Sequence, residues 1–254
     1  MLIKESYEDY ASRPGLRSSD MKRLYRTPSE FWLSRQEGYQ PKPQSKAMGL
    51  GEYVHALLLE PDRLEKFAVN PGLDGRTAEG KKWVSENSEK SIISLADAEL
   101  AKRLDWKCRN HPRAGKLVSA QADKEVSLEG SFNGRPAKIR IDCHLPDIIG
   151  DIKTTRHGTV EDFLHDCALF DYDLQAVFYR EVYASVFEPV LPHWFWIVIS
   201  TASEEIWCIN LSDMPDFILS GMAKLAIALK NLEQIELLGA SAISDDRAVL
   251  SQRT

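Results

Sequence analysis

The chain has 254 residues, 43% of them hydrophobic, with 32 lysines and arginines against 38 aspartates and glutamates, a formal net charge of -6. A chain of this length can form one large domain or two small ones. Its negative net charge argues against a protein that coats nucleic acid through its overall charge, although a local basic channel is compatible with an acidic chain. No apolar run approaches the ~20 residues that span a bilayer, and the N-terminus lacks the apolar centre of a secretory signal, so we expect no membrane association and a cytoplasmic protein.

Short helices are expected in the N-terminal part of the chain. Residues 17–35 open with two serines and an aspartate, which are good helix N-caps, and Thr27-Pro28 separates a first helix from a second. Residues 38–46 carry two prolines without apolar periodicity, which indicates a connector. The next segment, "AMGLGEYVHALLLEPDRLEKF", predicts a helix interrupted near Pro61.

A second helical stretch follows a charged loop. The glycine-rich segment "NPGLDGRTAEGKKW" predicts a loop leading into a helix. Residues 92–118 predict one or two further helices, and Ser94 is the expected cap at the start of "SLADAELAKRL".

From residue 124 the pattern changes to the alternation of β-strands. The segment "KEVSLEGSFNGRPAKIRIDCHLPDIIGDIKTT" predicts three antiparallel strands, with turns at Asn133-Gly134 and at 145–147. A helix at about 160–187 is expected next, then strands in "HWFWIVIS" and "EEIWCINL" and a last helix at about 213–236. The polar tail, 237–254, is predicted to be mobile.

Charged residues interrupt two strands that are otherwise apolar. Because side chains alternate along a strand, Asp151 and Lys153 share one face of the third strand. Hairpin pairing brings Asp142 close to Asp151, and such a group costs free energy unless something compensates it. The alternation predicts two faces for the second strand: Lys138, Arg140 and Asp142 on one, and Ile139, Ile141 and Cys143 on the other.

Two interpretations fit this charged group. It is a surface hairpin with solvated charges and a Lys–Asp pair across the strands, or it binds a divalent metal. Two aspartates supply the hard oxygen ligands suited to Mg²⁺, and a lysine beside them can orient or deprotonate an attacking water and stabilise phosphate charge.

The arrangement resembles the PD-(D/E)XK nuclease superfamily, in which an Asp on one strand precedes (D/E)-x-K on the next. Asp142 and "DIK" at 151–153 match these positions, whereas Pro146-Asp147 lies in the turn, only three residues before Asp151. The resemblance implies a mixed α/β fold with a restriction-endonuclease-like core, in which a central mixed sheet is flanked by helices and preceded by a helical region.

Three more features extend the resemblance. They are His55 in "GLGEYVHALLLEP", Glu125 in "ADKEVSLEG", and Gln175 with Tyr179 in "DLQAVFYREVY". Each alone has a plain explanation: a core histidine, a solvated strand residue, one face of a helix. In this order they are similar to the RecB-type nucleases. With "LRSSDMKRLYRTPSEFW", "GRTAEGKKW" and "IIGDIKTT", residues 14–185 resemble the nuclease domain of phage-type exonuclease VIII (RecE-like).

The resemblance implies a single nuclease domain, 1–254, with a helical part (1–118) and a catalytic sheet core (119–236). Mg²⁺, with Mn²⁺ as a substitute, would be held by His55, Asp142, Asp151 and the backbone carbonyl of Ile152. Lys153 would position the water, and Glu125 would complete the shell of a second ion or act on the water. Gln175 and Tyr179 would orient the DNA backbone or the lysine.

The resemblance also implies an exonuclease that digests one strand of linear double-stranded DNA from its 5′ end, in recombination and repair, as a homo-oligomeric ring beside a single-strand annealing (RecT-like) partner. The spacing of Cys108, Cys143, Cys167 and Cys208 does not match the iron-sulfur pattern of some relatives, so we expect no cluster. A structure- or site-specific endonuclease and a non-catalytic DNA-binding assembly protein remain alternatives. The expected phosphate contacts are Arg17, Lys22, Arg23, Arg26, Arg76, Lys81 and Lys82.

Overall fold

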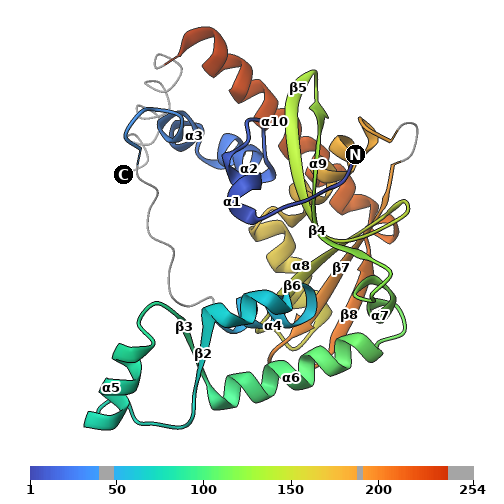
Figure 1. The fold of residues 1–254 in the computed structure, drawn as a ribbon. Coiled ribbons are helices and arrows are strands. Elements are labelled where there is room, and N and C mark those ends of the chain that lie inside the picture. Colours follow the sequence, from blue (N-terminus) through green and yellow to red (C-terminus); the bar gives the residue numbers. More distant parts are fainter. Residues whose placement is uncertain (40–48, 188–190, 240–254) are drawn as a thin grey trace.

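A six-stranded mixed sheet forms the centre of the computed structural model, which describes residues 1–39, 49–187 and 191–239 (Figure 1). The strand order is β1-β4-β5-β6-β7-β8; β6 and β7 run parallel, and the other neighbours run antiparallel. This confirms the predicted fold class, a mixed sheet flanked by helices. The strands are β1 (Ile3–Lys4), β4 (Asp123–Phe132), β5 (Arg135–Leu145), β6 (Ile148–Thr155), β7 (His193–Ser200) and β8 (Ile206–Asn210).

The two predicted turns join β4, β5 and β6. Asn133 and Gly134 have φ angles of 47° and 75°, the positive values that a two-residue hairpin turn requires. Asp147, between β5 and β6, also has a positive φ, 58°. The three predicted antiparallel strands are therefore confirmed.

Hydrophobic cores lie on both faces of the sheet. In β7, Trp194 and Trp196 belong to one core and Ile197 and Ile199 to the other, because both faces of this strand are covered. The first core is completed by α2 (Ser18–Arg26), α8 (Val160–Leu169), α9 (Tyr172–Ala184) and α10 (Pro215–Leu238). The second is completed by α4 (Gly49–Leu59), α6 (Leu95–Asn110) and α7 (Ala114–Leu117).

Strict alternation fails in β5 at Asp142. Ile139 and Ile141 belong to the first core but Cys143 belongs to the second, so the prediction that these three side chains share a face was wrong. The reason is local: the Asp142 carboxylate accepts a hydrogen bond from the backbone N–H of Ile152, at 2.8 Å, and so lies between β5 and β6. The strand changes the face it presents at the point where its carboxylate reaches toward the neighbouring strand.

The single helix predicted at 160–187 is two helices, α8 and α9, which meet at Asp171. This residue has a φ of 54°, a left-handed conformation that a continuous helix does not contain. Its buried carboxylate pairs with Arg26 of α2 and Lys224 of α10. These cations explain why a non-glycine residue is retained at the break.

The remaining elements lie outside the sheet. Strands β2 (Phe67–Asn70) and β3 (Ser91–Ser94) form a two-stranded parallel sheet. This sheet was not predicted, because four residues are too few to show a clear alternation. Helix α5 (Ala78–Glu86), between them, is capped by Thr77, and the predicted Ser94 cap of α6 is present. The other elements are α1 (Tyr7–Ser12), α3 (Pro28–Ser34), η2 (Pro61–Lys66) and η3 (Leu211–Asp213).

Helix α2 is capped by Arg17, so the two serines and Asp20 expected as caps lie in its first turn. The connector predicted at 38–46 and the mobile tail predicted at 237–254 fall largely outside the described residues, and α10 continues to Leu238. Among the described helices, none combines the length and the apolar character needed to cross a bilayer.

Replacing Gly221 with alanine is expected to destabilise the fold by about 1–2 kcal/mol, because a Cβ there would lie 2.6 Å from the backbone oxygen of Asp173 and 2.8 Å from Cγ2 of Val177. Overpacking of α10 against α9 outweighs the gain in helix propensity of roughly 0.5–1 kcal/mol. Denaturant unfolding measures the difference. The control is Gly75→Ala, where nothing lies within 4 Å of the added Cβ; equal stability of the two variants would contradict the packing argument.

Candidate active site

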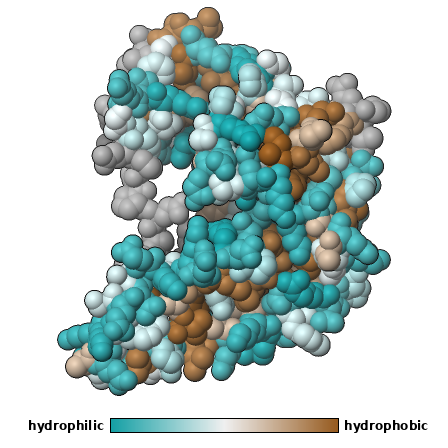
Figure 2. Space-filling model, in the orientation of Figure 1, coloured by the Kyte–Doolittle hydropathy of each residue, from teal (hydrophilic) through white to brown (hydrophobic). Residues whose placement is uncertain are grey.

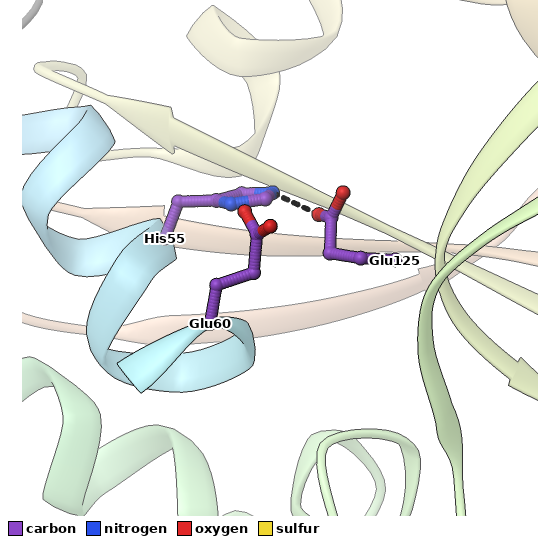
Figure 3. Close-up of side chains that lie close together, drawn as sticks. All are labelled: His55, Glu60 and Glu125. Atoms are coloured by element: carbon purple, nitrogen blue, oxygen red, sulfur yellow. Dashed lines mark ion pairs between the residues drawn. The ribbon is translucent and has the colours of Figure 1, made fainter. Parts of the chain in front are cut away.

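Side chains from α4 and β4 meet beside the central sheet. His55 lies on α4, Glu60 follows the helix, and Glu125 extends from β4 toward the imidazole (Figure 3). Their ligand atoms all lie within 4.8 Å of one another. The Nε2 atom of His55 is 3.4 Å from Oε1 of Glu125 and 3.5 Å from Oδ2 of Asp142. One imidazole nitrogen thus faces two carboxylates from neighbouring strands.

Strands β4 and β5 are not paired at Glu125 and Asp142. The pairing passes from Lys124–Cys143 directly to Val126–Ile141, and Glu125 has a left-handed φ of 53°. The N–H and C=O of one strand residue point to the same edge. Because the N–H of Ile152 donates to Asp142, its carbonyl also points toward this unpaired stretch, as expected for the predicted backbone ligand.

The carboxylates perturb one another. Burial, and then the charge of Asp142, raise the pKa of Glu125 to about 7. Its Oε2 accepts a hydrogen bond from Arg140 at 2.6 Å, but its buried Oε1 has no hydrogen-bond partner in the described chain. Burial also acts to raise the pKa of Asp142, but the hydrogen bond and charge of His55 outweigh it and lower that pKa.

This donor set fits a divalent cation. Carboxylate oxygens and an imidazole are common ligands of divalent ions, and a bound cation favours the ionised form of a carboxylate. Oε1 of Glu125 accepts no hydrogen bond from the described residues and lies 3.4 Å from Nε2 of His55, so it is available as a ligand atom. The ligand atoms of His55, Glu60 and Glu125 are close enough together to hold one ion, and Asp142 faces the same imidazole.

A chain of polar contacts connects the next carboxylate to α9 and α2. Asp151 forms an ion pair with Lys153, and its Oδ1 accepts a hydrogen bond from Gln175 at 3.2 Å. Lys22 donates in turn to Oε1 of Gln175, at 3.2 Å. Burial acts to lower the pKa of Lys153, but the charges of Asp151 and Asp142 outweigh it and raise that pKa, which favours the ammonium form. In that form the side chain can stabilise negative charge.

Tyr172 lies between the two lysines, and sequence reasoning missed it. The Nζ atoms of Lys153 and Lys22 are 4.8 Å and 5.1 Å from the centre of its ring. Burial, and then the charge of Lys153, lower the pKa of Lys22 to about 8. Each cation–π contact contributes about 0.5–2 kcal/mol, so the ring helps to hold two like charges close together.

Two clefts border the cluster, one on each side, and both are lined by His55 and Arg63. The first, about 410 Å³, continues past Lys153 to Arg156. The second, about 310 Å³, is lined by Asp142, Glu125 and the predicted residues Arg17 and Tyr179. In Figure 2 hydrophilic residues border a hollow between the N-terminal helices and α4. Because both are lined by His55 and Arg63, the two clefts are adjacent and form two arms of the site.

The structure thus brings seven of the predicted site residues together: His55, Glu125, Asp142, Asp151, Ile152, Lys153 and Gln175. Tyr179 lies apart from Lys153, because its hydroxyl is hydrogen-bonded to the backbone of Arg140. Among the predicted DNA contacts, Arg17 lines the second cleft and Lys22 lies inside the site.

The other predicted DNA contacts line neither cleft. Arg23 lies 3.8 Å from Asp20, and Arg26 is held by Asp171 and the carbonyl of Leu169. On the segment around α5, Arg76 pairs with Asp74, Lys82 lies 3.8 Å from Glu86, and Lys81 lies on the helix itself.

Five residues of the site were missed: Glu60, Arg63, Arg140, Tyr172 and Arg156. Glu60 and Arg63 flank Pro61, where the interruption of the helix was predicted, and Arg156 follows Lys153 by three residues. These short separations from predicted ligands were the available signals. Tyr172 precedes Gln175 by three residues on α9, but the break at Asp171 that begins this helix had no signal in the periodicity.

A family model described as "PDDEXK-like domain of unknown function (DUF3799)" matches residues 17–241. Among solved structures, the chain is similar to a protein of Eubacterium rectale described as a "Putative exonuclease". The two share 16% sequence identity with a TM-score of 0.63, over 92% of this chain and 86% of the other, which is a likeness of fold. No match was found among curated proteins.

We expect Mg²⁺ or Mn²⁺ to raise the melting temperature of the wild-type protein, because a ligand that binds only the folded state stabilises it. Asp142→Asn should lose most of this rise, since it removes one negative charge while its amide oxygen can still accept the Ile152 hydrogen bond. Asp123→Asn, at the exposed start of β4, is the matched control. Thermal unfolding with and without metal measures the effect, and an unchanged metal response in Asp142→Asn would contradict the assignment.

Proposed function

The chain belongs to the PDDEXK-like family, and on that premise we propose that it is a Mg²⁺-dependent exodeoxyribonuclease that hydrolyses linear double-stranded DNA. The fold and the family support a nuclease. Digestion from the 5′ end, leaving 3′ single-stranded tails, is the part of the proposal that rests on the similarity of residues 14–185 to RecE-like nuclease domains.

The observation that carries the proposal is the convergence of His55, Glu125 and Asp142 beside the ion pair of Asp151 and Lys153. An ion held by these carboxylates and the imidazole would supply positive charge to the scissile phosphate. Phosphodiester hydrolysis builds negative charge on that phosphate, and preorganised cations stabilise it most where water is excluded. The site combines both requirements, a place for a cation and a partly buried ammonium.

The residues around Lys153 hold its charge in place. Asp151 favours the protonated lysine, and Gln175 restrains Asp151 through a hydrogen bond to Oδ1. Tyr172 packs against the same ammonium, so the side chain is restrained by a carboxylate and by a ring. The proposed role of Lys153 is to orient the attacking water and stabilise charge on the phosphate.

The partners are also proposals. DNA ends would reach the two clefts, and the acidic net charge makes binding depend on local cations. A homo-oligomeric ring and a RecT-like annealing partner follow from the resemblance. Outer phosphate contacts by the basic residues Arg23, Arg26, Arg76, Lys81 and Lys82 are also part of the proposal.

Digestion of end-labelled linear duplex tests the proposed activity. With Mg²⁺ or Mn²⁺ we expect mononucleotides or short products, with Ca²⁺ or EDTA no cleavage, and with a covalently closed circle no cleavage in any of these conditions. Labels at the 5′ and 3′ ends report which strand is degraded. Nicking or linearisation of the closed circle would indicate an endonuclease, and the absence of cleavage of any DNA would contradict a catalytic role.

Lys153→Ala should lower the turnover rate by roughly two orders of magnitude or more, the scale for the loss of one preorganised electrostatic group. Duplex affinity in Ca²⁺ should stay within a few fold, because Lys153 is already paired with Asp151. Lys230→Ala, an exposed lysine on α10, is the control and should change neither quantity. Near-normal turnover at saturating DNA, combined with weaker binding, would show that Lys153 is only a phosphate contact.

A further inference from the structure

Arg156 has an unusual environment among the arginines of the described chain. Within residues 1–39, 49–187 and 191–239, the other arginine side chains form an ion pair or a hydrogen bond, Arg113 excepted. Arg156 is exposed, and its guanidinium contacts no carboxylate. An unpaired guanidinium keeps its full charge and its five N–H donors for a ligand.

The position of Arg156 places that charge at the first cleft. It follows the last residue of β6 and lines the 410 Å³ cleft together with Lys153 and Thr154. The other cations of this cleft are already paired, Lys153 with Asp151 and Arg63 with Glu60. Glu52 is the carboxylate that lines the cleft, and it forms no ion pair in the described chain. Arg156 is therefore the cation of this arm that is available to an anion from outside.

The size of the cleft limits what can enter. A volume of about 410 Å³ is in the range of sites that hold one small ligand, so the cleft suits a nucleotide-sized part of one strand. Arg156 follows Lys153 by three residues and lines the same cleft, so a phosphate bound by Arg156 would lie in the same arm as the phosphate that faces Lys153.

We propose that Arg156 forms a binding site for a phosphodiester of the DNA strand being cut, next to the scissile phosphate, with the free hydroxyl of Thr154 as a second donor. This deepens the proposed nuclease function and rests on it. The substrate strand would cross the metal-binding cluster from one cleft to the other and leave the duplex before it reaches Arg156. The site recognises the backbone and not the bases, because its donors match phosphate oxygens.

The test measures binding of a fluorescent single-stranded oligonucleotide in Ca²⁺ at several salt concentrations. Arg156→Ala should weaken affinity about tenfold, the scale of one hydrogen-bonded charge contact, and lower the salt slope by about one. Arg156→Lys should recover part of the affinity by restoring the charge. Arg113→Ala removes an equally exposed and unpaired arginine that lines neither cleft, and should leave binding unchanged. Thermal unfolding of each variant verifies that the fold is intact.

The outcomes separate this site from the nuclease activity. Unchanged binding in Arg156→Ala, or an equal loss in Arg113→Ala, overturns the phosphate site even when the wild type digests linear DNA. Failure of the wild type to cut any DNA, with an Arg156-dependent affinity for the strand, overturns the nuclease function and supports the phosphate site. A deoxynucleoside 5′-monophosphate that abolishes the whole Arg156-dependent part of the binding would assign Arg156 to a released nucleotide, and this overturns a site for the strand.

Discussion

The carboxylates gathered where β4, β5 and β6 separate are the constraint on which the rest of the structure depends. Removing an ion from water costs several kcal/mol even after relaxation, so Glu125, Asp142 and Asp151 require compensating partners. Each has one: Arg140 for Glu125, the imidazole of His55 and the Ile152 amide for Asp142, and Lys153 for Asp151. The oxygen of Glu125 that has no hydrogen bond is where this compensation is incomplete, and it faces the centre of the cluster.

The residues that contact these carboxylates come from helices on both faces of the sheet. His55 lies on α4, which packs in the second core, whereas Gln175 lies on α9, which packs in the first. Helix α4 can approach β6 because its second glycine is close to Thr154: a Cβ at Gly51 would lie 2.7 Å from Oγ1 of that threonine. The left-handed residue Asp171 begins α9 where Tyr172 and Gln175 face the site. The same carboxylate anchors α2 through Arg26, and α2 carries Lys22.

The charge distribution reconciles an acidic chain with an anionic ligand. Most arginines in the described residues are paired with neighbouring carboxylates. The first cleft is lined by a partly buried cation, Lys153, and by an exposed one, Arg156. The first turn of α4 also borders this cleft, and the positive end of a helix dipole favours anions. In the proposed function, these features would attract a phosphate to the cluster locally, whatever the net charge.

The sequence by itself determined the elements and the ligands whose signals are local. The alternation of apolar residues and the Asn133-Gly134 turn predict the β4–β5 hairpin. The spacing of Asp142, Asp151 and Lys153 predicts that they meet across the next turn, because the register of a hairpin is set by its turn and its apolar pattern. Only the tertiary structure decided that β5 changes face at Asp142, that α8 ends before Asp171, and that Glu60, Arg140 and Tyr172 belong to the site. Lys22 and Gln175 are 153 residues apart in the chain, and their hydrogen bond depends on the packing of α2 against α9. Periodicity describes which face of an element is apolar, but it holds no information on which distant side chain will compensate a buried charge.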